Sequence, residues 1–454
     1  MTLPLLPTLD ELLHPERQPE SIRSKALACT DPLDPIQLFN MTWRQPEGQI
    51  EHRVLPKSLT GVEAPIVVMS GRRFPTGSHK VGPAYSCARD ALLRSEITPD
   101  GSTLVFPSTG NYGIGGAWVG PRLGFKSLVV LPEEMSAERF EKINGYGARI
   151  SATPGSESNV KEIYDRVAEL RADPDNFILN QFADWGNYRF HHHCTGGAAL
   201  ALAADLEAQG IGGGKIAAFV SAMGSAGTMA AADRIRSEQP HLKTVAVEPI
   251  QCPTLYNVGF GAHAIEGIGD KHVTWIHNVL ATDLLVCVDD LSCVRGLQLL
   301  QEGRDTLREH LGLDAEWLQS IDGVFGISGV CNILASIQAA RHLGLGPDDP
   351  IYTVATDGFD RYPSVMRRLD SQEGPQTEDV ARKRIDIFRD QTPQMVLDGT
   401  PEVCLRWHNQ KYFTWVEQQG MHVDELNALG DPSFWEGQAA LVPDMDRQTL
   451  ALRG

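Results

Sequence analysis

Short apolar runs alternate with stretches of helical periodicity from Thr103 to Ala355, and this alternation restricts the fold more than any other feature. The runs predicted as strands are 103–106, 127–131, 149–153, 177–182, 216–220, 244–247, 284–288 and 351–355. Helices are predicted after residue 113 and at 137–144, 160–171, 195–208, 229–238, 294–310 and 330–343. Such alternation indicates an α/β fold whose parallel sheets are covered by helices on both faces. Ligands of such folds bind at the carboxyl ends of the strands.

A chain of 454 residues exceeds what one hydrophobic core usually supports, so we expect two domains with appendages. Residues 1–60 have few periodic patterns and several prolines, which favours an N-terminal extension that wraps over a core. We assign 61–184 to a smaller α/β domain and 185–362 to a larger one. The sequence then becomes charged and polar, and we predict a helical C-terminal extension over 363–454.

The C-terminal extension contains an amphipathic helical pattern at 404–419, with an aromatic stripe formed by Trp407, Tyr412, Phe413 and Trp415. An apolar stripe of this kind needs a surface to cover it. We therefore expect both extensions to pack on the shared core or across a homodimer.

Charge and cysteine content restrict the partners and the compartment. The formal net charge of −18 argues against nucleic-acid and anionic-membrane partners, because both require a basic face. The eight cysteines are scattered and contain no C-x-x-C pair, which favours reduced thiols in the cytoplasm over a disulfide framework or a zinc site. The N-terminus does not have the pattern of a signal peptide, and no run approaches the roughly 18 apolar residues of a membrane span.

One lysine, Lys80, lies in a turn of small residues that includes Gly77, Ser78, Gly82 and Pro83. An isolated lysine is usually a solvated charge. A lysine that is desolvated near a cofactor can instead have a lowered pKa and become a Schiff-base nucleophile. This turn makes Lys80 a candidate for the second role.

Two further turns rich in Gly, Ser and Thr each follow an apolar segment and precede a helical pattern. The turn Ser108-Thr109-Gly110-Asn111 offers hydroxyl, amide and N–H groups where a helix begins, which suits a carboxylate or a simple capping role. The turn Gly224-Ser225-Ala226-Gly227-Thr228 could close its N–H groups on a phosphate, or only allow tight helix packing. It lacks the lysine of a nucleoside-triphosphate P-loop.

Three consecutive histidines, His191 to His193, look like a metal cluster. Adjacent residues of a helix point about 100° apart and therefore rarely share one metal ion. We expect no metal site there.

Taken together, these motifs resemble those of the cysteine synthase and cystathionine β-synthase family, a group of fold-type II pyridoxal-phosphate (PLP) enzymes. The similarity extends from about Thr76 to Tyr362. The segments that carry it are Gly77-Ser78-His79-Lys80, Ser108 to Gly115, Met135 to Arg139 with Tyr146-Gly147-Ala148, Gln181-Phe182 with Asn187 and His191, Gly224 to Thr228, Val247-Glu248-Pro249, Ile265 to Gly269, Gly326 to Gly329, and Gly358 to Tyr362.

The resemblance implies a fold similar to the tryptophan synthase β chain, with two three-layer α/β/α domains and the site between them. It also implies roles for single residues. Lys80 would form the internal aldimine and act as acid and base at Cα. The PLP contacts would come from Asn111 at the 3′-oxygen, Ser328 at the pyridine nitrogen, and Gly224, Ser225, Ala226, Gly227 and Thr228 at the phosphate. The substrate contacts would come from Ser108, Thr109, Gly110, Tyr112 and Gln181.

The sequence departs from the family pattern at several positions. Val81 and Gly82 follow Lys80 where Asp and Arg are common, and Tyr112 stands where Thr is usual. Tyr112 follows Asn111 in the loop that should close on the substrate, so we expect it to select the β-substituent and to disfavour O-acetylserine. The alternative is that Tyr112 packs inside the helix and only shapes the loop.

The resemblance predicts a PLP-dependent lyase or transferase of the cytoplasm that acts on a small β-substituted L-amino acid. It would eliminate or replace the β-substituent through an aminoacrylate intermediate. One alternative is a fold-type II dehydratase acting on a hydroxy-amino acid. Another is a catalytically silent homologue that serves as a binding partner, although the retention of Lys80 and of the phosphate turn argues against it.

Overall fold

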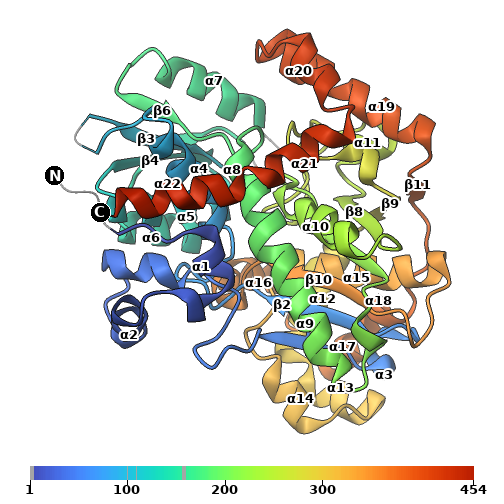
Figure 1. The fold of residues 1–454 in the computed structure, drawn as a ribbon. Coiled ribbons are helices and arrows are strands. Elements are labelled where there is room, and N and C mark those ends of the chain that lie inside the picture. The colour runs from blue at the N-terminus through green and yellow to red at the C-terminus, as the bar shows by residue number, and fades with distance from the viewer. Residues whose placement is uncertain (1–4, 100, 109, 156–159, 454) are drawn as a thin grey trace.

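The protein is described by a computed structural model that covers residues 5–99, 101–108, 110–155 and 160–453. Within these residues the strands form one seven-stranded sheet and one four-stranded sheet, each covered by helices (Figure 1). Figure 1 shows the two lobes side by side, with the red helix α22 crossing the smaller lobe close to the N-terminal helix α1. None of the described helices combines the length and the apolarity that crossing a membrane requires.

The larger sheet is parallel in its centre and has an antiparallel strand at each edge. In sheet order its strands are β1 (His52–Val54), β2 (Ile66–Ser70), β10 (Ile351–Ala355), β7 (Ala218–Ala222), β8 (Lys243–Pro249), β9 (Leu284–Val288) and β11 (Val396–Asp398). The central strands are apolar on both faces because helices cover both sides.

The smaller sheet is parallel throughout. Its strands, in sheet order, are β5 (Arg149–Thr153), β4 (Lys126–Pro132), β3 (Thr103–Pro107) and β6 (Asn176–Ile178). The predicted α/β fold of type II, with two sheets and terminal extensions, is confirmed.

The chain does not enter the smaller lobe at the predicted boundary of residue 61. Strand β2 pairs with β10 in the larger sheet, so the smaller lobe begins only after Ser70. This strand was missed because the regular alternation becomes visible only at Thr103. An apolar run such as Ile66–Ser70 also does not reveal which sheet it joins, because its partner is nearly 300 residues away in the sequence.

The helices fall into four groups along the chain. The N-terminal segment contains α1 (Leu9–Leu13), α2 (Glu20–Ala28) and α3 (Lys57–Thr60), and the smaller lobe contains α4 (Val81–Leu93), α5 (Asn111–Arg122), α6 (Ala137–Gly145) and α7 (Val160–Leu170). The larger lobe contains α8 (Trp185–Phe190), α9 (Gly197–Glu207), α10 (Ala230–Glu238), α11 (Thr254–Asn257), α12 (Asp290–Glu302), α13 (Arg304–Leu311), α14 (Ala315–Ser320) and α15 (Ile327–Leu343). The C-terminal extension contains α16 (Pro363–Glu373), α17 (Glu378–Arg384), α18 (Asp386–Arg389), α19 (Pro401–Lys411), α20 (Val423–Ala428), α21 (Pro432–Ala440) and α22 (Val442–Leu452).

Three of the predicted helices are interrupted in the structure, and one of them is the helix at 404–419, which consists of α19 and the π-helical turn Tyr412–Gln418. The helix predicted at 294–310 is split into α12 and α13 at Gly303. The helix predicted at 195–208 is α9 preceded by a π-helical turn, His191–Gly196, which contains the three histidines. Hydrophobic periodicity follows a whole helical stretch and does not resolve such local changes of winding.

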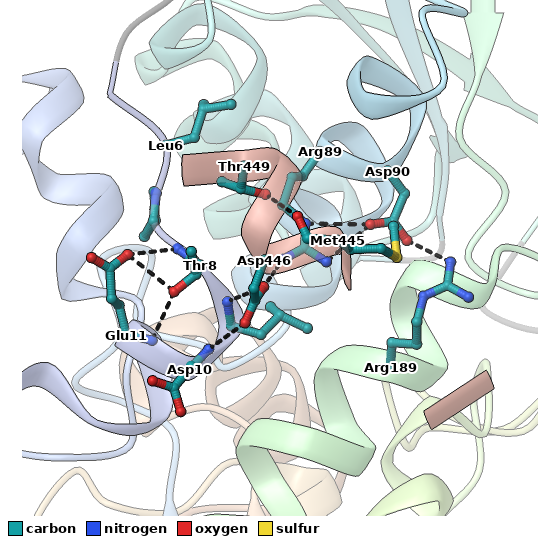
Figure 2. Close-up of polar contacts among 12 residues, drawn as sticks. Leu6, Thr8, Asp10, Glu11, Arg89, Asp90, Arg189, Met445, Asp446 and Thr449 are labelled. Carbon is teal, nitrogen blue, oxygen red and sulfur yellow. Dashed lines mark hydrogen bonds and ion pairs between the residues drawn. The ribbon is translucent and has the colours of Figure 1, made fainter. Parts of the chain in front are cut away.

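The last helix fastens both termini to the smaller lobe through buried charges (Figure 2). The carboxylate of Asp446 on α22 accepts hydrogen bonds from the N–H groups of Leu9 and Asp10, both at 3.0 Å. It also accepts a 2.9 Å bond from the guanidinium of Arg89 on α4, which in turn pairs with Asp90. The extensions therefore pack on the helix whose first turn follows Lys80.

Candidate active site

Lys80 lies directly before α4, after the turn that leaves β2. Its side chain is buried, and its Nζ donates a 3.1 Å hydrogen bond to Oγ of Ser225. These two residues are 145 positions apart in the sequence. The fold therefore brings the candidate lysine to the candidate phosphate turn.

The environment of Lys80 favours its neutral form. Burial lowers the pKa of Lys80 to about 8, although the nearby charge of Asp270 opposes this shift. A lysine with this pKa is partly neutral close to neutral pH, and the neutral amine is the nucleophilic form.

Asp270 is a site residue that the sequence did not single out. Its side chain is buried, and among the described residues its Oδ2 has no hydrogen-bond partner. Burial raises the pKa of this carboxyl to about 7, while the charge of Lys80 acts in the opposite direction. A buried carboxyl that is left unpaired beside a buried lysine is unfavourable for folding and typical of a catalytic site. Its one sequence signal is its position directly after Gly269.

The turn at 224–228 has the backbone of an anion site. It follows β7, and Ala226 adopts a left-handed conformation (φ 59°) that is uncommon for a residue with a side chain. Within the described chain, the N–H groups of Gly224, Ser225 and Ala226 have no hydrogen-bond partner. Free N–H groups in such a turn at the start of a helix form a concave site for an anion.

Packing around this turn explains its glycines. Asn187 donates through Nδ2 to Oγ of Ser225 at 2.9 Å, and its Oδ1 is a buried acceptor without a partner among the described residues. A Cβ atom at position 227 would lie 2.1 Å from that oxygen, so Gly227 is required by the close approach. A Cβ atom on Gly224 would lie 2.6 Å from a backbone oxygen of Gly267.

The candidate carboxylate loop is shaped by Ser108. Its Oγ accepts hydrogen bonds from the N–H groups of Gly110 at 2.9 Å and Gly113 at 2.8 Å, so the hydroxyl caps the start of α5. Gln181 reaches the same loop through a 3.4 Å bond from Nε2 to the carbonyl of Pro107. Thr109 lies outside the described residues. The structure therefore brings Ser108, Gly110 and Gln181 together.

Asn111 belongs to a buried polar network that crosses between the lobes. Its Nδ2 donates to Oδ2 of Asp357 at 2.6 Å, and its Oδ1 accepts from Nε of Arg361 at 2.8 Å. Tyr362 donates its hydroxyl to the same Asp357 oxygen at 2.9 Å. These bonds fix the carboxamide of Asn111, so its contact with a cofactor oxygen stays a prediction.

Arg139 is a second residue of the candidate site that the sequence did not single out, although it lies in a segment that carries the family resemblance. Its buried guanidinium donates from Nε to Oε2 of Glu266 at 2.7 Å and lies 5.8 Å from the ring centre of Tyr362. A Cβ atom at position 110 would lie 2.0 Å from Nη1 of Arg139, so Gly110 is required by the arginine. The arginine therefore supports the candidate carboxylate loop from behind.

Tyr112 lies in the core of the smaller lobe. Its hydroxyl donates to the carbonyl of Leu179 over 3.3 Å, and its ring packs 5.7 Å from that of Phe106. These are the contacts of the packing alternative, and they support it over the role in substrate selection.

Two further buried side chains, Ser328 and His79, belong to the candidate site. Ser328 lies in the first turn of α15, and its predicted contact with the pyridine nitrogen stays a prediction. His79 precedes the lysine and is fully buried, with neither ring nitrogen partnered among the described residues. Its ring lies 5.1 Å from that of His191, and burial lowers the pKa of His79 well below its usual value.

Comparison with known proteins decides the family. The family described as pyridoxal-phosphate dependent enzyme matches residues 57–304, more than half of the chain. A cysteine synthase from Staphylococcus aureus is 31% identical over 290 residues, which are 63% of this chain and 84% of that protein. This chain belongs to the cysteine synthase-like pyridoxal-phosphate enzymes.

Other relatives agree with this assignment. Cysteine synthase B from Campylobacter jejuni is 30% identical over 63% of this chain and 86% of its own length. A hydrogen sulfide-producing enzyme from Fusobacterium nucleatum is 26% identical, with a TM-score of 0.57 over 71% of this chain and 88% of that chain. An O-acetylserine sulfhydrylase from Entamoeba histolytica, 21% identical with a TM-score of 0.60 over 76% and 94%, shares the fold.

In this pyridoxal-phosphate enzyme, the geometry of Lys80 and of the turn at 224–228 fits the cofactor. The amine of Lys80 is buried at the candidate phosphate turn, where three consecutive N–H groups have no partner among the residues that the structure describes. An aldehyde that carries a phosphate suits these donors, because the lysine can take the aldehyde while the turn binds the phosphate.

Proposed function

We propose that this enzyme eliminates or replaces the β-substituent of a small L-amino acid, with its PLP held on Lys80. The observation that carries the proposal is the buried Lys80 amine, which contacts the candidate phosphate turn and lies in the field of the buried carboxyl of Asp270. A hydrogen sulfide-producing enzyme of 26% identity and TM-score 0.57 has been determined in complex with an alpha-aminoacrylate intermediate. This likeness supports β-elimination chemistry for the present enzyme.

The chain's own residues would divide the work as follows. PLP, when bound, supplies the electron sink that loss of a β-substituent requires. Lys80 would move the proton at Cα, while the loop of Ser108 and Gly110, together with Gln181, would bind the substrate carboxylate. Asp270, with a pKa near 7, can give a proton to a leaving group or take one from an entering nucleophile.

Spectroscopy of the purified protein tests the cofactor and its lysine. The wild type should be yellow, and borohydride reduction followed by peptide mass spectrometry should find the cofactor on Lys80. Lys80→Ala should lose both this adduct and turnover. A colourless wild type that gains no colour when PLP is added would overturn the proposal.

A panel of β-substituted L-amino acids then tests the reaction. We expect keto-acid release, or a replacement product when a thiol is added, from at least one member of the panel. Release from serine or threonine alone would favour the dehydratase instead.

We further propose a cytoplasmic homodimer. All eight cysteines are free thiols, and seven of them are buried, which supports a reducing compartment. Phe260 and Phe413 expose 75% and 60% of their surfaces, and exposed aromatic residues are typical of a contact surface. Light scattering coupled to size exclusion should give twice the mass of the chain, and a monomer at micromolar concentration would contradict this proposal.

A further inference from the structure

Three side chains form a buried row along the C-terminal extension. Trp407, Lys411 and Trp415 are spaced by four residues on α19 and on the π-helical turn Tyr412–Gln418 that continues it. Successive positions at this spacing drift by about 40° on a regular α-helix. The wider π turn compensates for this drift, so the three side chains can face one neighbour.

Every member of the row donates hydrogen bonds to backbone carbonyls of one segment, residues 254–277. In order along the row, the acceptors are the carbonyls of Leu255 at 2.8 Å, of Trp275 and His277 at 3.0 and 2.7 Å, and of Val273 at 2.8 Å. All three donor side chains are almost completely buried. Each bond is therefore shielded from competition by water.

The segment that receives these bonds carries Asp270. Thr254, at its start, donates its hydroxyl to the backbone carbonyl of Asp270 at 2.8 Å. The residue before Asp270 is tied to the loop that precedes the phosphate turn, through a 2.7 Å bond from Gly269 N–H to the carbonyl of Met223. The carbonyl that Trp415 binds lies three residues after Asp270. The row therefore holds the chain on both sides of this carboxyl.

The row also contains the amine of Lys411, which is not needed to fill space in a packed core. Lys411 is fully buried, and burial lowers its pKa to about 7. Removing an ammonium group from water is unfavourable, whereas an apolar side chain would fill the same space without this penalty. What the lysine adds is a pair of directed bonds to two carbonyls.

We propose that Trp407, Lys411 and Trp415 are positioning residues that fix the 254–277 segment, and with it the carboxyl of Asp270, against Lys80. The row lies outside residues 57–304, the part that the family matches. The C-terminal extension is thus a working part of the site. Its catalytic consequence rests on the function proposed above, but its structural consequence does not.

Conservative substitutions separate positioning from folding. Trp407→Phe and Trp415→Phe keep an aromatic ring and remove one N–H donor each, and the double variant removes both. Lys411→Met keeps the length and removes two bonds. The matched control is Trp317→Phe in the larger lobe, because it removes a 3.1 Å bond from Nε1 to the carbonyl of Val54, away from the row.

Hydrogen exchange gives the first readout and needs no turnover. In the PLP-loaded double variant, amides of residues 254–277 should exchange roughly tenfold faster, because each lost bond had limited local opening. The control should leave this segment unchanged. Unchanged exchange of 254–277 in the double variant overturns the proposal.

Steady-state kinetics and cofactor spectra give the second readout. The double variant should lose roughly tenfold in kcat while the absorbance of bound PLP and KM stay near the wild-type values. Lys411→Met should show the same pattern if it folds. A loss of kcat that runs in parallel with cofactor release and with a lower melting temperature would show a merely structural role. Faster exchange in an enzyme with no activity on any tested amino acid would leave the row in place and overturn only the proposed function.

Discussion

Replacing Asp446 by alanine tests whether α22 holds the N-terminal helix α1 and the C-terminal extension against the smaller lobe. The carboxylate accepts two backbone bonds at 3.0 Å, from Leu9 and Asp10, and one from Arg89 at 2.9 Å (Figure 2). The guanidinium of Arg89 is completely buried. Alanine at position 446 would therefore leave two N–H groups and part of a buried charge without an acceptor.

The size of the effect follows from these contacts. A hydrogen bond to a charged group contributes about 1.5–3 kcal/mol, and removing one partner of a buried ion pair costs about 3–5 kcal/mol. Arg89 keeps a second carboxylate, Asp90, within 3.1 Å. We therefore expect a loss near the lower end of this range, about 3 kcal/mol in the free energy of unfolding.

Urea unfolding followed by tryptophan fluorescence measures this loss. Asp444→Ala is the matched control, because Asp444 lies on the same helix and pairs with Arg447 at the surface, where a salt bridge contributes about 0–1 kcal/mol. Equal losses in the two variants would refute the reasoning, since burial would then make no difference to the value of the ion pair.

Three further predictions concern the site. Asp270→Asn should lower kcat about 100-fold and remove an inflection near pH 7 from the pH profile of kcat, and an unchanged profile would contradict the acid–base role. The pH dependence of PLP incorporation should move to lower pH, because the lost negative charge had raised the pKa of Lys80. Gly227→Ala should weaken PLP binding about tenfold or more, because its Cβ would lie 2.1 Å from Oδ1 of Asn187. Gly437→Ala is the control, because a Cβ there meets open space and should leave PLP binding unchanged; equal affinities of the two variants by equilibrium dialysis would contradict the prediction. Tyr112→Thr should lower kcat/KM in parallel across the substrate panel, because its hydroxyl and ring make packing contacts, and a change of relative preference would return Tyr112 to substrate selection.

The strands and the turns were predictable because their signals are local. The strands predicted at 284–288 and 351–355 have the same bounds in the structure. Turns that follow the strands of a parallel sheet lie where such sheets bind ligands, so their small residues indicate the candidate site from the sequence alone. Lys80 was recognisable for the same reason, since the small residues that surround it are its neighbours in the sequence.

The sheet membership of β2 and the role of Asp270 were not predictable. A buried strand has the same apolar pattern in either sheet, and the parallel bonds of Ile66–Ser70 to Ile351–Ala355 join segments far apart in the chain. Burial raises the pKa of Asp270, and how deeply this carboxyl is buried depends on the folded chain. The sequence alone does not predict whether the carboxyl of a given aspartate is buried or exposed to solvent.

The sequence by itself determined the strands between Thr103 and Ala355, where the turns rich in Gly, Ser and Thr lie and which lysine is the candidate nucleophile, because these depend on neighbours along the chain. The tertiary structure alone decided that Lys80 meets Ser225, that Asn111 meets Asp357, and that the C-terminal row reaches the segment of Asp270. Trp407, Lys411 and Trp415 donate to backbone carbonyls, which every residue has, so no pattern of side chains in the sequence predicts these acceptors. Which carbonyls accept these bonds depends on how the whole chain folds.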